Sequence, residues 1–319
     1  AMYVAAAAAA AAAAAMVAAT AAAADGGAPD GHMQRLGTFG NNVGPPEEHD
    51  TTAADYVDMT AREFYLQYIA LSKPLILRGL ARRWPAHRLW ASDEYLVSKI
   101  GNYTVHAEKT KKEVRGEEQV PLRFADYVTA AAASPEKYYV VDDLPHVLYD
   151  DCALPAMMDC GSYNVEIPSW WVSTGGTLSV LHMDSIHNMH CLVAGKKDFV
   201  LAAPSQREAF YVSTEAEGGT SPLDVEHVDL EKYPTVATAR YHAFTLDAGD
   251  CLYIPATWLH HVYSRERNIA VTSWFGSTGE TDPALPQREI TYDAATCKNQ
   301  PTDAELDAAA RGGGGRRRR

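Results

Sequence analysis

The most informative part of the chain is residues 177–204, which read TLSVLHMDSIHNMHCLVAGKKDFVLAAP. Apolar and β-branched residues fill both halves of this stretch, and residues 195–197 separate the halves with a turn signal. The pattern predicts two successive strands. Side chains at positions i and i+2 of a strand lie on the same face, so we expect His182 and Asp184 to point together and Met183 to point away.

A second informative stretch, residues 247–260, reads DAGDCLYIPATWLH. It predicts a tight turn, a short apolar strand, a proline that ends the strand and then His260. Two histidines and one carboxylate can hold one face of Fe(II) and leave positions open for a cosubstrate and for oxygen. We therefore take His182, Asp184 and His260 as candidate metal ligands, although His-X-Asp by itself recurs by chance. The neighbouring His261 points the other way on an extended chain.

The rest of the chain predicts a helix-rich first part followed by many short strands. Thr60 and Glu63 fit a capping box ahead of an apolar run, which indicates a helix start. Further helices are expected over residues 92–100 and 122–132, and a short strand over 75–77. Later in the chain, β-branched and aromatic runs alternate with Gly, Pro and Asp turns at residues 163–172, 178–193, 198–203, 244–246, 251–254 and 269–275. Such spacing favours an antiparallel barrel or sandwich.

Composition narrows the classes of function. The 319 residues include 28 Lys and Arg against 41 Asp and Glu, for a net charge of -13, and five of the basic residues sit in the C-terminal tail. An acidic chain of this kind argues against a nucleic-acid partner. The five cysteines show no CxxC spacing, and an odd number cannot all pair within one chain. We therefore expect neither a disulfide framework nor a thiolate zinc site, and interpret the cysteines as small buried apolar residues.

The ends of the chain are low in complexity. Residues 3–24 are alanine-rich and uncharged, and they are long enough to span a bilayer. Alanine drives membrane insertion weakly and no basic residue precedes the stretch, so filler, a signal sequence or anchor, and a transit segment all stay open. Membrane association therefore stays open as well. So does the compartment, which is either the cytoplasm or nucleus, or the secretory pathway. Asn102-Tyr103-Thr104 is a glycosylation sequon, which matters only in a secretory protein.

Taken in order, these motifs resemble those of the JmjC-type, cupin-like 2-oxoglutarate oxygenases, in particular the branch of small protein hydroxylases. The resemblance covers roughly residues 55–276, and it also rests on KPLILRGL at 73–80, RRWPAHRLW at 82–90 and KYYVVDDLP at 137–145. It implies a mainly β fold, a double-stranded β-helix or jelly roll with N-terminal helices packed on one sheet. We expect three regions along the chain: a low-complexity segment and linker at 1–54, a JmjC or cupin-like catalytic domain at 55–295, and a disordered Gly/Arg tail at 296–319.

The resemblance also implies roles for single residues. His182, Asp184 and His260 would bind Fe(II), and Lys197, fifteen residues after His182, would hold the distal carboxylate of 2-oxoglutarate. Lys196 competes with Lys197 for this role, and the spacing within the family selects Lys197. Relatives place polar partners for the same cosubstrate at three further positions, which in this chain are Ser179, Asn188 and Tyr139.

Two features depart from the related motifs. Many relatives carry asparagine two residues before the tryptophan of the last core strand, where this chain has Thr272, so its affinity for the cosubstrate is expected to differ. The strand that follows Asp184 also carries His187 and His190. Alternation places His190 on the same face as Asn188, near the pocket, and leaves His187 a structural role.

The implied reaction couples the oxidative decarboxylation of 2-oxoglutarate by O2 to the hydroxylation of a side chain in a protein or peptide substrate. Three alternatives stay open: a catalytically silent cupin-like binding protein, a metal-dependent cupin isomerase or sugar-binding enzyme, and a JmjC lysine demethylase. The fold alone does not select among these substrates. Several small members of the family dimerise through C-terminal helices, so a homodimer is also an open arrangement.

Overall fold

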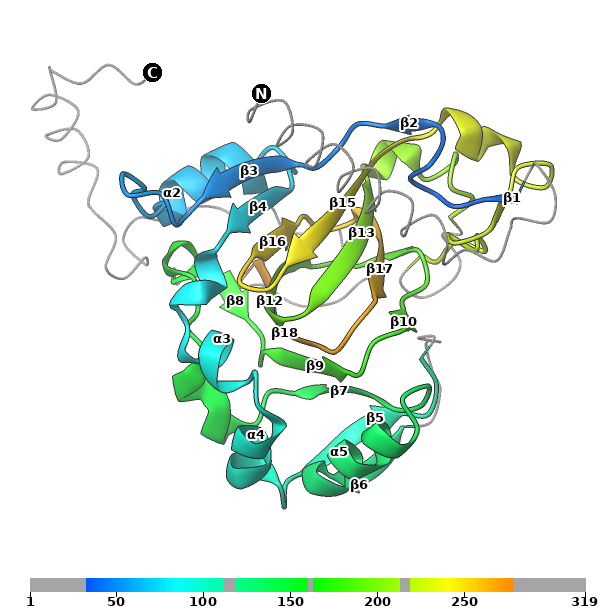
Figure 1. Ribbon diagram of the computed structural model, residues 1–319. Coiled ribbons are helices and arrows are strands. Elements are labelled where there is room, and N and C mark those ends of the chain that lie inside the picture. The colour runs from blue at the N-terminus through cyan, green and yellow to red at the C-terminus, as the bar shows by residue number, and fades with distance from the viewer. Residues whose placement is uncertain (1–32, 112–118, 160–162, 213–218, 278–319) are drawn as a thin grey trace, which may run out of the picture.

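The structure, a computed structural model, describes residues 33–111, 119–159, 163–212 and 219–277. Two facing β-sheets form its centre (Figure 1). The larger sheet has the strand order β3 (Glu47–Asp50), β4 (Leu75–Arg78), β16 (Cys251–Ile254), β12 (His187–Ala194), β18 (Asn268–Ser277), β9 (Ser169–Ser173), β7 (Tyr139–Asp143), β5 (Thr104–Glu108) and β6 (Val120–Arg123), and β8 (Tyr163–Val165) also pairs with β18.

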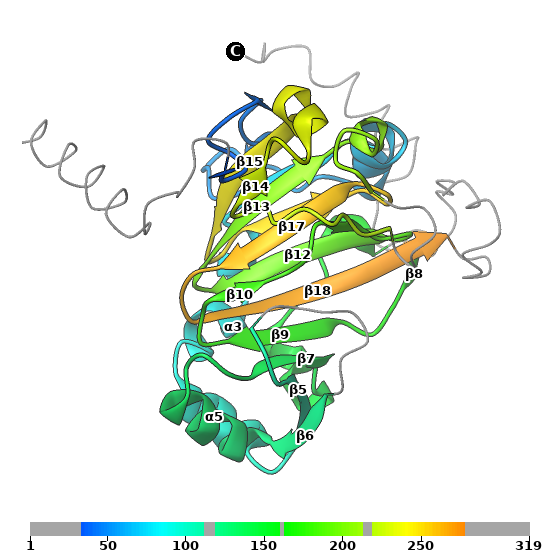
Figure 2. The same ribbon diagram turned by 90° about the vertical axis from the view of Figure 1, so that its right-hand side faces the viewer.

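The smaller sheet has the strand order β10 (Thr177–Leu178), β17 (Leu259–Ser264), β13 (Lys196–Ala202), β15 (Arg240–Asp247) and β2 (Asn41–Asn42), and β11 (His182–Met183) also pairs with β17. A separate short ladder joins β1 (Met33–Gln34) to β14 (Val228–Asp229). Figure 2 shows the stacked strands of both sheets from the side. The fold is the jelly roll that the resemblance implied.

Strand alternation divides each central strand between two cores. In β12, Leu192 packs between the sheets, whereas Met189, Cys191 and Val193 pack against the helices. Because β12 has a period of two, Asn188 and His190 share the inward face with Leu192. In β13, Phe199 and Leu201 face inward in the same way, and so does Lys197. The inner space therefore receives polar groups from strands that are otherwise apolar.

The helices cover the outer face of the larger sheet (Figure 1). They are α2 (Ala61–Phe64), its π-helical continuation η1 (Tyr65–Ile69), α3 (Pro85–Leu89), α4 (Asp93–Ile100) and α5 (Phe124–Ala133). Short 3-10 helices lie at η2 (Leu80–Arg83), η3 (His146–Asp151), η4 (Ala156–Met158), η5 (Pro204–Gln206) and η6 (Pro234–Thr238). No helix in the described part of the chain is both long and apolar enough to cross a membrane.

The predicted helix start at Thr60 is confirmed. The Thr60 hydroxyl accepts a hydrogen bond from the Glu63 amide at 3.1 Å, and the Glu63 carboxylate accepts one from the Thr60 amide at 3.1 Å. These two bonds satisfy amides that have no partner inside the first turn. The predicted helix over 122–132 begins two residues later than expected, because residues 120–123 pair with β5 as the strand β6.

Two predictions about chain organisation are wrong in detail. Residues 33–50 were expected within a linker, but they contain β1, β2 and β3, with β3 pairing in parallel with β4. Their polar sequence is compatible with this because an edge strand needs only backbone hydrogen bonds on one side. The single strand expected over 178–193 is divided into β10, β11 and β12, and the one over 163–172 into β8 and β9.

The expectation about cysteines is also partly wrong. Cys191 and Cys251 are buried, as expected, but they form a disulfide between β12 and β16. The two residues lie directly opposite each other in the register of these antiparallel strands. An odd number of cysteines rules out complete pairing but not one pair, and the sequence separation of 60 residues concealed the contact. Cys152 is free, whereas Cys160 and Cys297 lie outside the described residues.

Candidate active site

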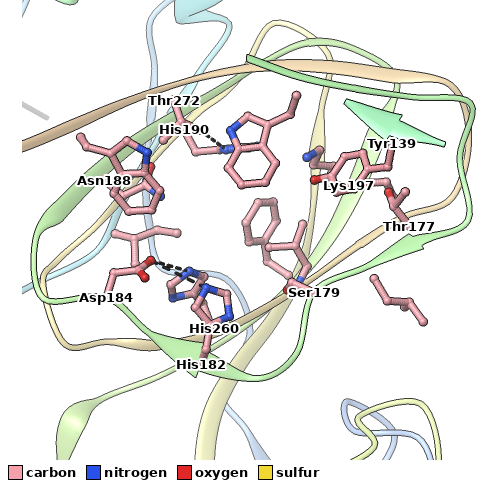
Figure 3. Close-up of a pocket in the computed structure, with 17 residues that line it drawn as sticks. Tyr139, Thr177, Ser179, His182, Asp184, Asn188, His190, Lys197, His260 and Thr272 are labelled. Carbon is pink, nitrogen blue, oxygen red and sulfur yellow. Dashed lines mark hydrogen bonds and ion pairs between the residues drawn. The ribbon is translucent and has the colours of Figure 1, made fainter. Parts of the chain in front are cut away.

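A cavity of about 150 Å³ lies between the two sheets (Figure 3). Its lining comes from strands β7, β9 to β13 and β16 to β18 and from the turns that join them. All eight residues predicted as site residues line it: His182, Asp184, His260, Lys197, Ser179, Asn188, Tyr139 and Thr272. The tertiary fold thus gathers into one place residues that are spread over more than 130 positions of sequence.

The three candidate metal ligands meet at one end of the cavity. His182 on β11 and His260 on β17 are opposite each other in register, and their ring centroids are 4.1 Å apart. Asp184 follows β11, and its Oδ2 lies 3.7 Å from Nε2 of His182 and 3.3 Å from Nε2 of His260 (Figure 3). The possible ligand atoms of all three residues lie within 4.8 Å of one another. One ion can therefore contact all of them.

Backbone carbonyl groups fix the orientation of both imidazole rings. Nδ1 of His182 lies 2.7 Å from the carbonyl oxygen of Val180, and Nδ1 of His260 lies 3.1 Å from that of Trp258. A carbonyl oxygen only accepts hydrogen bonds, so each Nδ1 carries a proton and each Nε2 is the nitrogen that faces the cavity and Asp184. Histidines that bind metals in proteins are typically oriented in this way.

A tight turn before β17 holds the third ligand. The amide of Thr257 donates a hydrogen bond to the carbonyl oxygen of Asp184 at 2.7 Å. Thr257 adopts a positive φ of 66°, which is uncommon for a β-branched residue. The amide of Trp258 closes the turn by donating to the carbonyl oxygen of Pro255 at 3.2 Å. This turn fixes the backbone of Asp184 relative to the strand that carries His260.

A buried cation lies at the other end of the cavity. Lys197 is only 2% exposed, and its ammonium group lies 5.9 Å from the ring centre of Trp171. Figure 3 shows Lys197 beside Tyr139, and Tyr139 also packs against Trp171. Lys196, by contrast, is exposed and pairs with Asp247 at 3.2 Å. Of the two neighbouring lysines, only Lys197 reaches the cavity.

Several polar groups between these two ends are buried. Nδ1 of His190 lies 2.9 Å from the Thr272 hydroxyl, while its Nε2 has no hydrogen-bond partner. Burial holds the pKa of His190 well below its ordinary value, and the nearby Lys197 ammonium group lowers it further, so the neutral form of the ring is favoured. Oδ1 of Asn188 is likewise buried without a partner. Buried polar atoms of this kind are typical of a site that binds a polar ligand.

The hydroxyl of Ser179 already accepts a hydrogen bond from the Val262 amide at 2.8 Å. It therefore keeps its own hydrogen as a donor for the cavity.

Sequence reasoning did not select Trp171 and Thr177, which also line the cavity. The alternation of β9 could have found Trp171, because its neighbour Trp170 packs among the helices and the next residue must face the other way.

The two other histidines near the candidate ligands in sequence, His187 and His261, lie outside the cavity, as expected. His187 contacts the Tyr253 hydroxyl at 2.8 Å and the Ala256 amide at 3.1 Å through Nδ1, and its ring stacks against both Tyr253 and Phe275. His261 faces the other side of the smaller sheet, where its Nδ1 lies 2.7 Å from the carbonyl oxygen of Ser179. Neither residue reaches the candidate ligands' cavity.

Comparison with known proteins identifies a related family. The family model described as a cupin-like domain matches residues 61–281. The chain is 29% identical over 230 residues to the Jumonji C domain-containing protein 5 of Drosophila melanogaster, covering 67% of this chain and 57% of that protein. It is 29% identical over 267 residues to the bifunctional peptidase and (3S)-lysyl hydroxylase JMJD7 of Homo sapiens, covering 70% of this chain and 84% of that protein.

A third relative is the lysine-specific demethylase JMJ30 of Arabidopsis thaliana, which is 27% identical over 231 residues, covering 69% of this chain and 53% of that protein. The chain thus spans just over half the length of two of these relatives and most of the third.

Proposed function

The chain belongs to the cupin-like domain family, and from this membership and the geometry of the cavity we propose that it is an Fe(II)- and 2-oxoglutarate-dependent oxygenase that hydroxylates a protein side chain. The observation that carries the proposal is the cavity itself. Two imidazole Nε2 atoms and one carboxylate converge at one end, and a buried lysine lies at the other. This arrangement suits a cosubstrate that chelates a metal with one end and carries a carboxylate at the other.

The donor set fits Fe(II). Two neutral imidazoles and one carboxylate form the ligand set that non-haem Fe(II) oxygenases use, whereas structural zinc sites favour four ligands with thiolates. His182, Asp184 and His260 would hold the ion. Bound Fe(II) supplies the activation of O2, which is coupled to the conversion of 2-oxoglutarate into succinate and carbon dioxide. The carbonyl groups that orient the two rings keep their Nε2 atoms available for the metal.

The residues of the cavity would bind and orient the cosubstrate. Lys197 would form a charge-assisted hydrogen bond with the distal carboxylate, which is strong because the site excludes water. The Thr272 hydroxyl can donate to Nδ1 of His190, and Nε2 of that ring would then be a donor that faces the cavity. We propose Ser179, Asn188 and Tyr139 as further polar contacts, as the sequence indicated. The surrounding apolar core would keep bulk water away from the metal.

Hydroxylation is proposed ahead of demethylation because of the extent of the matches. The relative whose length is largely covered is named a lysyl hydroxylase, whereas the chain covers about half of relatives named demethylases. Both reactions oxidise a C–H bond, and only the position of that bond differs. A substrate screen with unmodified and N-methylated lysine peptides separates them: a mass gain of one oxygen on the unmodified peptide supports the proposal, and methyl loss with release of formaldehyde supports the demethylase.

The first test measures succinate formed by the purified chain with Fe(II), ascorbate, O2 and 2-oxoglutarate, with His182→Ala as the matched control. We expect slow turnover without substrate, lost in the variant together with iron binding. A second measurement titrates 2-oxoglutarate into the anaerobic Fe(II) protein and follows the metal-to-ligand charge-transfer band. A band without succinate under any substrate would favour the silent binding protein. Metal binding with neither band nor succinate would favour the cupin isomerase or sugar-binding enzyme.

A further inference from the structure

The glycosylation sequon Asn102-Tyr103-Thr104 lies at the surface. Asn102 and Tyr103 lie in the turn between α4 and β5, Thr104 is the first residue of β5, and all three residues are exposed. Backbone hydrogen bonds hold the turn on both sides: the Tyr103 amide donates to the Ile100 carbonyl oxygen at 2.8 Å, and the Phe124 amide donates to the Tyr103 carbonyl oxygen at 2.9 Å. An asparagine in an exposed Asn-X-Thr turn is the acceptor that N-linked glycosylation requires.

The disulfide between Cys191 and Cys251 is an independent observation that concerns the same compartment. Both residues are at most 1% exposed, and they join two central strands of the larger sheet, β12 and β16. Disulfides form and persist in oxidising compartments and are rare where cellular thiols are kept reduced. An exposed sequon arises by chance in many proteins. The disulfide in the sheet core does not depend on the sequon, so it supports an oxidising compartment independently.

Neither the sequon nor the disulfide contributes to the lining of the cavity. Cys191 lies on the helix side of β12, while the preceding residue, His190, faces the cavity. No residue of α4 or β5 lines the cavity, and Figures 1 and 2 place these elements at the end of the molecule opposite β15. A glycan on Asn102 would therefore leave the cavity lining untouched.

We propose that Asn102 is a site of N-linked glycosylation, in a chain built to fold in an oxidising compartment of the secretory pathway. Nδ2 of Asn102 forms a bond to the anomeric carbon of an oligosaccharide, the bond from that carbon to a lipid pyrophosphate breaks, and the amide loses one proton. The Cys191 and Cys251 thiols lose two protons and two electrons to the disulfide of a thiol oxidoreductase, which is reduced to its dithiol. One consequence rests on the proposed oxygenase function: the protein substrates would be proteins that pass through the same compartment.

The test expresses the full chain in eukaryotic cells behind a cleavable secretory signal and compares it with three variants. We expect the wild-type chain and Thr104→Ser to show a mobility shift that peptide N-glycosidase removes. Asn102→Gln and Thr104→Ala should lack that shift while keeping the same melting temperature as the deglycosylated wild type, because both side chains are exposed. A folded, secreted wild-type chain without a glycan at Asn102 would overturn the proposal.

The oxidation state of the cysteines is measured in the same secreted protein. After denaturation and alkylation without a reductant, the peptides that contain Cys191 and Cys251 should remain joined, while Cys152, which is free in the structure, should be alkylated. Alkylation of Cys191 and Cys251 would contradict the proposal. A second result would also contradict the proposal: the secreted chain is degraded, whereas the same chain made in bacterial cytosol folds with both thiols reduced. Neither readout needs catalytic turnover, so failure here is distinct from failure of the oxygenase proposal.

Discussion

Single buried side chains set what the cavity can hold. Lys197 points into it from β13 at 2% exposure, whereas Lys196, its neighbour in sequence, pairs with Asp247 at the surface. Removing an ammonium group from water is costly unless an anion compensates for the lost hydration. The Lys197 ammonium group lines the cavity and could pair with an anionic ligand. The proposed dicarboxylate would reach both this lysine and a metal at the opposite end.

We expect Lys197→Met to weaken binding of 2-oxoglutarate by about 10- to 100-fold, because a hydrogen bond to a charged group contributes about 1.5–3 kcal/mol. Fe(II) affinity should stay the same, since the candidate ligands are unchanged. The anaerobic charge-transfer titration measures both quantities. Lys196→Met is the matched control and should bind like the wild type. If both variants bound 2-oxoglutarate equally well, Lys197 would not be the residue that holds it.

His187 predicts a dependence of stability on pH. Burial lowers the pKa of His187 from 6.5 to about 4 in the folded chain. At pH values between these two, the unfolded chain binds a proton that the folded chain does not, so the free energy of unfolding falls as the pH drops. From pH 7 to pH 5, this residue should account for a loss of about 2 kcal/mol.

The check is urea unfolding of the wild type and His187→Gln at pH 7 and pH 5. The variant should be less stable at pH 7, because the contacts of the ring with Tyr253 and the Ala256 amide are altered. Its stability should also change less between the two pH values. Identical pH slopes for the two proteins would mean that His187 does not titrate as proposed.

At the scale of elements, the pairing of β11 with β17 and the turn before β17 assemble the candidate metal ligands. The two histidines are directly opposed only because β11 is antiparallel to β17 in that register, and a slip by one residue would turn each to the other face. Asp184 lies just beyond β11, where a strand pattern no longer fixes its direction. The Thr257 amide, which donates to the Asp184 carbonyl oxygen, supplies the missing constraint.

Thr257 therefore provides a matched pair of variants. Thr257→Gly keeps the amide and adopts the positive φ of 66° without strain, so Fe(II) affinity should be close to that of the wild type. Thr257→Pro removes the donor and cannot adopt a positive φ, so Fe(II) affinity should fall at least tenfold, about 1.4 kcal/mol. Calorimetric titration of Fe(II) under argon, with circular dichroism to verify folding, measures both. Equal affinities would remove the role proposed for this turn.

At the scale of the whole molecule, the larger sheet joins the helical layer to the cavity. One face of β12 packs on the helices and contributes Cys191, and the other face contributes Asn188 and His190 to the cavity. The disulfide to β16 sits at the middle of this sheet. Because it links residues 60 positions apart, it restricts the unfolded chain over a long loop.

We expect the double variant Cys191→Ala, Cys251→Ala to lose about 2–4 kcal/mol of unfolding free energy relative to the oxidised wild type. Thermal and urea unfolding with and without dithiothreitol measure this loss. The reductant should destabilise the wild type and leave the variant unchanged, which separates loss of the covalent link from loss of packing. A wild-type chain that responds no more than the variant would contradict a structural role for the disulfide.

The jelly roll and most of the candidate site follow from patterns that are local in sequence. The capping box at Thr60, the strand at 251–254 and the His-X-Asp spacing each depend on residues a few positions apart, so they can be recognised along the chain. The resemblance then proposed which residues would work together, and all eight of those residues line one cavity. Alternation also correctly separated His190 from His187, because a period of two needs no knowledge of the partner strand.

The features that sequence reasoning missed depend on partners far away in the chain. The strands within 33–50 have a polar sequence and become strands only because β14, β15 and β4 offer them unpaired backbone groups. The Cys191–Cys251 disulfide and the choice of Trp171 over Trp170 for the cavity depend on register and on which face the helices cover. The sequence by itself thus determined the fold class and the candidate ligands, while the tertiary structure decided edges, cross-strand bonds and the cavity wall, because those contacts exist only between chain segments that pairing brings together.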